Sequence, residues 1–515
     1  MERTEEQNGR VQLEFTDKTQ PVELTAEITL PDYRSEISRL LWVRPTFMPP
    51  TRFQGGGKAD FSGPVRYNIL YTGPDGALYS AESEEGYAFS VPLESLAGYD
   101  AAEGVELSPE LSPDAVISRV MGPRKLSVRC RLHVRVRGYA TKNLTPRTRG
   151  EGTDRDRIHR LCDAVENGRL MAGEAEHMDV SDRIDVEPGE GELRVICADG
   201  SVFLPDVAAL DGAVRCRGEA VVSVLLCREA GEGESAVPFV ATRRIPFEKE
   251  VTLEGITPDC DARATGTLGE LRATVEDGKI LLDGRVTLCA EGQTEESVLL
   301  CRDVFLPGCR AECQFGEERM WRAGLCGNRN FSISGERPLS ELGLPADVTV
   351  LHSLADAEIK EKQAEGAKTA LLGEMRCHVL YRREGEYGVA EMAVPFRTVI
   401  EGACDDMSVD CCVPACRVTP VRDGSVLRAD AEIQLAVRMC QKNAIRMLAE
   451  ATFVPAEPLS RADLEICYPA AKDTLWDVGK RYGVSPDALA TANGISAEAP
   501  GSAESLAGVR YLLIP

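Results

Sequence analysis

The residues whose types and spacing could do chemistry are a glycine run, two cysteine clusters and five histidines. The run Gly55-Gly56-Gly57-Lys58 matches part of a phosphate-binding loop, in which backbone N–H groups cradle phosphate oxygens and a lysine neutralises them. The match is incomplete, because Arg52 stands where the first glycine is needed and Ala59 stands where a hydroxyl would bind magnesium. The run therefore predicts a loop before a strand and no nucleotide site.

The cysteines are a second candidate, because thiolates bind zinc. Two clusters stand out among the 18 cysteines: Cys309 with Cys313, and Cys404, Cys411, Cys412 and Cys416. Neither contains the Cys-x-x-Cys pair of structural zinc sites, and five histidines are all that could complete a ligand set. Many other cysteines lie within apolar alternation, where cysteine acts as a small buried hydrophobe. We therefore expect free thiols, with no metal and no disulfide framework.

Catalytic signatures are missing from the sequence. It contains neither the His-Glu-x-x-His pattern of zinc proteases nor the Gly-x-Ser-x-Gly turn of serine hydrolases. The histidines are scattered along the chain: His133, His159, His177, His352 and His378. Acidic residues are so abundant that their number singles out no catalytic carboxylate pair. We expect a protein that is not an enzyme and binds no cofactor.

Composition and charge exclude further classes. A chain of 515 residues with 43% hydrophobic and 28% charged residues should fold into about three to five domains. Its net charge of −24 argues against a nucleic-acid binder, because no cationic excess is present to neutralise phosphates. No run approaches the roughly 18 apolar residues of a spanning helix. The polar stretch Met1–Gln7 lacks the apolar segment of a signal peptide, so we expect a cytoplasmic protein.

A glycine followed by an alternating apolar strand occurs three times. The glycines are Gly63, Gly218 and Gly373, so both intervals are 155 residues (218 − 63 and 373 − 218). An apolar pair begins 23 residues before each glycine, with the first members Leu40, Val195 and Val350. An apolar–Pro–apolar step follows each strand: Val91-Pro92-Leu93, Ile245-Pro246-Phe247 and Val394-Pro395-Phe396. Alternation with period two is typical of half-buried strands, so we predict three tandem copies of one β-rich, sandwich-like domain.

We place these copies at residues 1–150, 151–310 and 311–455. Each copy ends in a further alternating strand, which predicts a separate core for each copy and an extended, modular chain. The segment from Asp154 to Met178 has apolar residues at a spacing of three to four, which predicts a helical connector before the second copy. We expect a further connection around Phe315–Phe331.

The closing strand of the first copy has a basic face. Its apolar residues, from Leu126 to Val136, alternate with Arg129, Arg131, His133, Arg135 and Arg137. Because alternate residues of a strand point to opposite sides, the apolar face should be buried and the basic face solvated. The alternative is that these arginines bind an acidic partner.

Residues 456–515 differ from the repeats. After a polar linker, Ile466-Cys467-Tyr468 and Tyr511–Ile514 predict two short strands. Between them, Asp473-Thr474 can cap a helix from Leu475 to Tyr482 that ends at Gly483, and Ser485 can cap a second helix from Pro486 to Ala492. The result is a small βααβ module, and we expect Leu475, Trp476 and Leu489 to be buried.

This module resembles a LysM domain at the following positions: Asp473-Thr474-Leu475-Trp476, Lys480 to Ser485, Leu489, Asn493 and Ile514-Pro515. It departs from the family at Lys472, where glycine is usual, and in a longer segment after Asn493, which alters one wall of the family's ligand groove. The resemblance implies a binding groove, which in the family holds N-acetylglucosamine polymers such as peptidoglycan. The residues that it implies for this groove are Asp473, Thr474, Leu475, Asn493, Gly494 and Ile495.

The triplicated strand is similar to the SPOCS domain of endospore-forming bacteria. Repeated SPOCS domains followed by a LysM domain resemble the spore-coat morphogenetic proteins. This resemblance implies a scaffold in the cytoplasm of the mother cell, at the forespore surface, that binds the ATPase of the coat's basement layer. The alternative is a wall protein that binds peptidoglycan through the LysM groove. Because no export signal is seen, we expect the module to bind a protein partner and to have little affinity for peptidoglycan.

Overall fold

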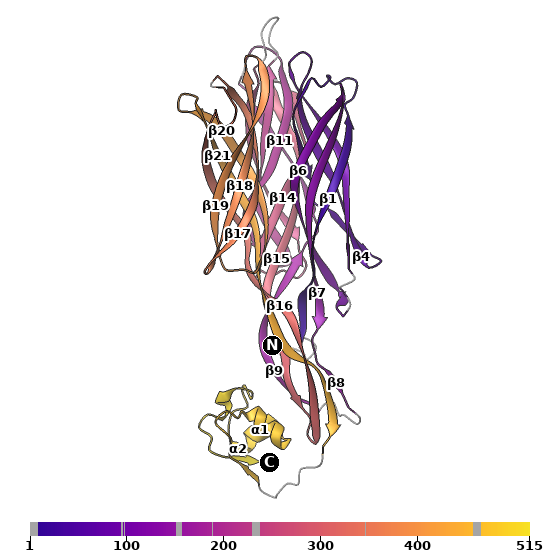
Figure 1. Ribbon diagram of the computed structural model, residues 1–515, viewed down its shortest axis with the longest axis vertical. Helices are drawn as coiled ribbons and strands as arrows, with labels where there is room; N and C mark the ends of the chain where they lie inside the picture. The colour runs from indigo at the N-terminus through magenta and orange to yellow at the C-terminus, as the bar shows by residue number, and fades with distance from the viewer. Residues whose placement is uncertain are drawn as a thin grey trace.

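The fold is mainly β, and three sandwiches of similar build stand side by side above a narrower stalk and a small helical module (Figure 1). The computed structural model describes residues 9–456, apart from residues 94–95, 97, 151–156, 188, 229–236 and 346, and residues 465–515. The expected leader and most of the linker before the module lie outside the described residues. The predicted combination of β-rich repeats and a βααβ module is confirmed.

The first sandwich pairs two sheets. One sheet has the order β1-β7-β6, with bounds β1 (Arg10–Thr29), β6 (Asp100–Gly122) and β7 (Lys125–Asn143). In the other sheet β4 is central and contacts β2, β3 and β5, with bounds β2 (Arg39–Phe47), β3 (Thr51–Gly55), β4 (Lys58–Thr72) and β5 (Leu78–Pro92). The glycine run at 55–58 is the tight turn between β3 and β4, where Gly56 and Gly57 have positive φ, so the loop prediction is confirmed.

The second and third sandwiches repeat this plan. The second has the sheets β10-β15-β14 and β11-β12-β13, with bounds β10 (Glu176–Asp185), β11 (Leu193–Ala209), β12 (Ala213–Arg228), β13 (Phe239–Thr252), β14 (Asp261–Glu276) and β15 (Lys279–Phe305). The third has the sheets β16-β21-β20 and β17-β18-β19, with bounds β16 (Cys309–Pro338), β17 (Thr349–Glu365), β18 (Lys368–Arg383), β19 (Glu386–Glu401), β20 (Asp406–Val421) and β21 (Val426–Pro455).

The three glycine-led strands occupy equivalent positions, as predicted. They are β4, β12 and β18, each central in its sheet. The residue eight after each glycine pairs with the first member of the upstream apolar pair, in the pairs Leu40↔Tyr71, Val195↔Leu226 and Val350↔Tyr381, and each pair is followed by a β-bulge. The glycine allows close approach: a Cβ on Gly373 would lie 2.2 Å from the ring of Phe396.

The proline landmark is equivalent in two copies and wrong in the first. Pro246 pairs with the residue after Gly218, and Pro395 pairs with the residue after Gly373. In the first copy Pro92 pairs with Lys58, five residues before Gly63, and Gly86 takes the equivalent position opposite Pro64. The Val91-Pro92-Leu93 step is therefore the end of β5 and carries no repeat signal.

Each sandwich has its own apolar core, which confirms one part of the modular prediction. The expectation of an extended chain is wrong, because equivalent residues of all three copies meet in one shared cluster. This apical cluster contains the equivalent leucines Leu70, Leu225 and Leu380. Neighbouring copies also contact through β11 with β5, β17 with β13, and β2 with β19. The copies therefore form a closed ring about a pseudo-three-fold axis.

The predicted helical connector is a strand. β9 (His159–Ala172) pairs with the distal half of β15, although Leu161, Leu170 and their apolar neighbours have helical spacing. Two features hide the period of two that a strand normally shows. A bulge at Cys301/Asp303 shifts the register of β9 against β15, and apolar residues are buried on both faces of β9. The residues of this segment before 157 lie outside the described residues. Phe315–Phe331 is likewise part of the long strand β16 and not a connection.

The stalk consists of the ends of these long strands. β15 and β21 have 27 and 30 residues, against 19 in the equivalent first-copy strand β7, and β16 has 30, against 20 in its counterpart β1. Their distal halves pack together with β9 and with β8 (Arg147–Arg149), which pairs in parallel with β21. The extra length places a platform of β9 and β15 beside the C-terminal module (Figure 1).

Candidate functional site

The C-terminal module has the predicted βααβ order: β22 (Glu465–Cys467), α1 (Leu475–Tyr482), α2 (Pro486–Asn493) and β23 (Leu512–Ile514), with a 3-10 turn η4 (Ala503–Leu506) before the last strand. Thr474 caps α1 in a capping box with Asp477, and Ser485 caps α2. Gly483 ends α1 in the left-handed conformation, as the sequence predicted. Leu475 and Leu489 are buried in the module core, as expected. Trp476 is also buried, but the expectation that it belongs to the module core is wrong, because it packs outside that core.

The residues expected on the first side of the groove already use their polar groups inside the module. The Asp473 carboxylate accepts from Ala470 N at 3.1 Å and from Arg481 at 3.1 Å. The Thr474 hydroxyl caps α1. Leu475 N donates to Ser505 Oγ at 2.9 Å. The long segment after Asn493 therefore folds back and occupies donors at the start of α1.

The second side of the groove is similarly occupied. The Asn493 side chain bridges α2 to β23: its Nδ2 donates to Leu489 O and Leu513 O at 2.8 Å, and its Oδ1 accepts from Leu513 N at 2.7 Å. Gly494 N donates to Thr491 O, and Ile495 N donates to Ala490 O. Leu475 and Ile495 pack on the same apolar core, and the side-chain polar groups and N–H groups described here for the expected groove residues stabilise the fold of the module.

Trp476 has a role that the sequence did not reveal. Its indole lies outside the module core and packs against Phe305 of β15, with ring centroids 5.0 Å apart, and against Leu161 of β9. Its Nε1 donates to Asp303 Oδ2 at 2.9 Å, and Lys480 Nζ lies 2.7 Å from the same carboxylate. A Trp and a Lys one helical turn apart on α1 could have indicated a docking face. We call this contact the module latch.

A second unexpected feature is a buried polar layer on the ring axis. Equivalent positions on β7, β15 and β21 are occupied by Arg137, Glu291 and Arg438, which pair with Ser108, Arg263 and Ser408 respectively. Glu291 binds residues of all three copies, because it accepts from Ser108 at 2.5 Å and lies 2.8 Å from Arg263 and 3.1 Å from Arg438. Burial alone would raise the pKa of Glu291, but the two guanidinium groups outweigh it and hold this pKa well below its usual range.

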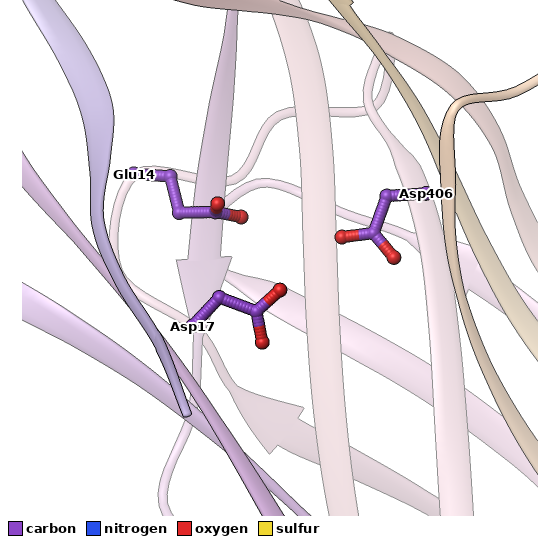
Figure 2. A group of neighbouring side chains, drawn as sticks. All are labelled: Glu14, Asp17 and Asp406. Carbon is purple, nitrogen blue, oxygen red and sulfur yellow. The ribbon is translucent and has the colours of Figure 1, made fainter. Parts of the chain in front are cut away.

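Glu14, Asp17 and Asp406 form the group of possible metal ligands found in the described part of the chain (Figure 2). Their carboxylates already have cationic partners. Arg135 binds Asp17 at 2.7 Å and Asp406 at 2.9 Å, and Lys442 binds Glu14 at 2.7 Å. Burial would raise the pKa of Asp406, but Arg137 and Arg135 lower it. The group is an ion-pair network between the first and third copies, in which each carboxylate is already bound by a cationic side chain.

The basic face of β7 is solvated at one end and engaged at the other. Arg129 and Arg131 are exposed, as expected. Arg135 belongs to the network of Asp17 and Asp406, and Arg137 is fully buried beside Glu110. The expectation of a solvated face is therefore wrong for Arg135 and Arg137, because the ring covers that end of the strand.

The cysteines form no disulfide and no recognisable metal cluster in the described residues. Burial raises the pKa of most of these thiols, to about 12 for Cys216 and Cys289. Two pairs are close. Cys377 and Cys416 have sulfur atoms 3.6 Å apart, and Cys162 faces Cys301 across the β9–β15 pair.

The LysM domain family matches residues 470–499. The match covers both helices and indicates a module of the kind that binds peptidoglycan or a related glycan. Comparison of the chain with curated proteins and with solved structures gave no match. Among the described residues, no helix is long and apolar enough to cross a membrane.

Proposed function

We propose that this chain is a non-catalytic scaffold in which a ring of three β sandwiches and a LysM module form one binding platform. The observation that carries the proposal is the module latch. Trp476 and Lys480 hold the LysM module on the stalk through Asp303. A partner bound to the module and a partner bound to the ring would therefore keep a fixed distance and orientation relative to each other. A stalk and a latch of this kind have no evident use in a protein that binds a polymer through a freely tethered module.

The proposed partner is suggested by two resemblances. The repeats resemble SPOCS domains, and repeats followed by a LysM domain resemble the spore-coat morphogenetic proteins. On this proposal the chain acts in the cytoplasm of the mother cell, at the forespore surface, and binds the ATPase of the coat's basement layer. The buried polar layer and the separate cores favour a stable platform, and the occupied donors of the groove favour a protein surface over a sugar as the module's ligand.

The second candidate is peptidoglycan binding, and the family match favours it. The first side of the groove would then offer backbone carbonyl groups and shallow apolar contacts to N-acetylglucosamine, because its N–H groups are used inside the module. Sugar binding of this kind would be compatible with the latch, because Trp476 packs against Phe305 and Leu161 of the stalk, whereas Leu475 and Asn493 bond to residues inside the module.

The deciding experiment compares the full chain with a chain that ends at residue 456. Both would be tested for co-sedimentation with purified peptidoglycan and for retention of the coat ATPase on a column. We expect the full chain to retain the ATPase and the chain that ends at residue 456 not to retain it. We expect neither chain to co-sediment with peptidoglycan. If the full chain co-sediments with peptidoglycan and does not retain the ATPase, peptidoglycan binding is the function instead.

A further inference from the structure

The repeated architecture allows equivalent strand edges to be compared within one molecule. β6, β14 and β20 are the edge strands of their sheets, and each has a counterpart in the other sheet: β2, β11 and β17. In the second and third copies the counterpart closes this edge. Gly200 of β11 lies so close to β14 that a Cβ there would be 2.4 Å from Leu268.

In the third copy a side chain also satisfies the edge. The hydroxyl of Ser353 on β17 donates to Cys416 O at 3.1 Å and accepts from Val418 N at 3.3 Å. Val418 is 5% exposed as a result. These two backbone groups of the edge strand are therefore already partnered, which opposes pairing with another chain at this point.

The first copy differs here. The strand equivalent to β11 and β17 is interrupted: β2 ends at Phe47, the chain passes through Pro49-Pro50, and β3 resumes the pairing with β4 at Thr51. Val43 occupies the position equivalent to Ser353. Val43 pairs with Ile69, and Ser353 pairs with Val379, so both residues of the third-copy pair lie 310 positions after their first-copy counterparts. The β6 groups equivalent to Cys416 O and Val418 N belong to Val116 and Ser118, which pair with Cys130 and Val128. Among the residues that the structure describes, no hydroxyl bonds to these two groups.

Apolar side chains are exposed along the same part of β6. The exposed fractions are 36% for Val116, 65% for Ile117, 38% for Val120 and 58% for Met121. Register shifts at Pro113/Ala115 and Val120/Gly122 bound a regular stretch between them. We call residues 115–121 the open edge. A regular, apolar and uncovered edge strand is a template for an added strand.

The charges beside the open edge are positive. Arg129 lies across from Ile117 on β7, and neither Arg129 nor Arg119 makes an ion pair with any residue that the structure describes. Arg131 is shared between Glu23 and Asp114, each at 3.7 Å. On a chain of net charge −24, two unpaired arginines on one exposed sheet face favour an acidic ligand. A second copy of this chain would bring the same two arginines to the edge and would be repelled.

The geometry points to the open edge of β6 as the docking strand for an extended segment of a partner protein, with apolar and acidic residues in alternation. The segment adds to the sheet beside β6, exchanges backbone hydrogen bonds with Val116 and Ser118, and places its carboxylates against Arg119 and Arg129. This inference deepens the proposed scaffold function, on which it rests, by naming a partner surface on the ring that is separate from the LysM module.

The test uses the full chain and a short labelled peptide of alternating valine and glutamate, with fluorescence anisotropy as the measurement. We expect saturable binding that the double variant R119E/R129E weakens by about tenfold or more, because both charge contacts become repulsive. A peptide with lysine in place of glutamate should bind R119E/R129E more tightly than it binds the wild-type chain. A peptide N-methylated at alternate residues should not bind, since it cannot pair with a strand edge. The variant Arg319→Glu is the matched control, because this exposed residue lies on the stalk strand β16.

Several outcomes would overturn the inference: no binding of the valine–glutamate peptide, equal binding by R119E/R129E, or undiminished binding of the N-methylated peptide. A concentration-dependent dimer that R119E/R129E abolishes would assign the edge to a second copy and would also overturn it. Retention of the coat ATPase is measured on the same variants. If the peptide fails to bind while the ATPase is still retained, the docking strand is wrong and the proposed scaffold function stands.

Discussion

The indole N–H of Trp476 donates to Asp303, a residue of the stalk that precedes it by 173 positions. The same carboxylate binds Lys480 one turn further along α1, so one acidic residue of β15 holds the LysM module through two contacts. Asp303 follows the bulge at Cys301/Asp303, which places it beside Phe305 and Leu161 at the distal end of the stalk. The orientation of the module therefore depends on a residue outside it.

Replacing Asp303 by Asn should release the latch. The substitution removes the negative charge that Lys480 binds and weakens the bond to Trp476, and hydrogen bonds to charged groups contribute roughly 1.5–3 kcal/mol. We expect faster amide hydrogen exchange in α1 and in residues 301–305, and a more extended particle by small-angle scattering. The control is Asp163→Asn, because Asp163 pairs with Arg302 on the same strand pair at 3.4 Å and makes no described contact with the module. Equal exchange in the wild-type chain and Asp303→Asn would mean that apolar packing alone holds the module.

Leu475→Ala should destabilise the module without affecting the ring. Leu475 is fully buried among Val478, Leu489 and Leu512, and deletion of a buried leucine side chain usually costs about 2–5 kcal/mol because a cavity remains. The measurement is hydrogen exchange of α1 and α2 as a function of denaturant. Lys472→Ala, an exposed change next to the same helix, should leave the exchange unchanged. A Leu475→Ala module as stable as the wild type would contradict the packing described for it.

The local parts of this structure were predictable from the sequence, and the reason is physical. Strand alternation and helix caps are set by neighbouring residues, so the strand at Gly373 and the α1 cap at Thr474 were found from their own segments. The apical leucines could have been found as well, since Leu70, Leu225 and Leu380 keep the 155-residue period.

The ring and the latch were not predictable from these patterns. The axial residues Arg137, Glu291 and Arg438 differ in chemical type, and their spacing is not 155, because the copies have hairpins of different length. β9 was misread as a helix because burial on both faces hides the period of two. Asp303 gave no signal, since one acid among many is informative only when its distant partner is known.

Thiol reactivity should distinguish paired from isolated cysteines. The contact with Cys301 lowers the pKa of the Cys162 thiol, whereas burial raises the pKa of the Cys216 thiol to about 12. Because the thiolate is the nucleophile, iodoacetamide at a mildly alkaline pH should label Cys162 well before Cys216. Mass spectrometry of peptides after timed quenching measures both rates in one sample, and denatured protein is the control in which the two should react alike. Faster labelling of Cys216 in the native chain would contradict its burial.

Acid should weaken the ring through Glu291. The pKa of this carboxyl is lowered in the folded protein by Arg263 and Arg438, so its stabilising contribution is complete above the unfolded pKa, near 4.5, and is lost as the pH falls below that value. Glu291→Gln should remove this contribution at neutral pH and leave two buried guanidinium groups short of a partner, which costs about 3–5 kcal/mol when a buried pair is broken. The free energy of unfolding in urea, measured from neutral pH downward, should therefore decline less steeply in the variant than in the wild type. The matched control is Glu295→Gln, because Glu295 pairs with Arg322 at the surface and such pairs contribute about 0–1 kcal/mol. If Glu291→Gln and Glu295→Gln have equal effects, the polar layer does not hold the three copies together.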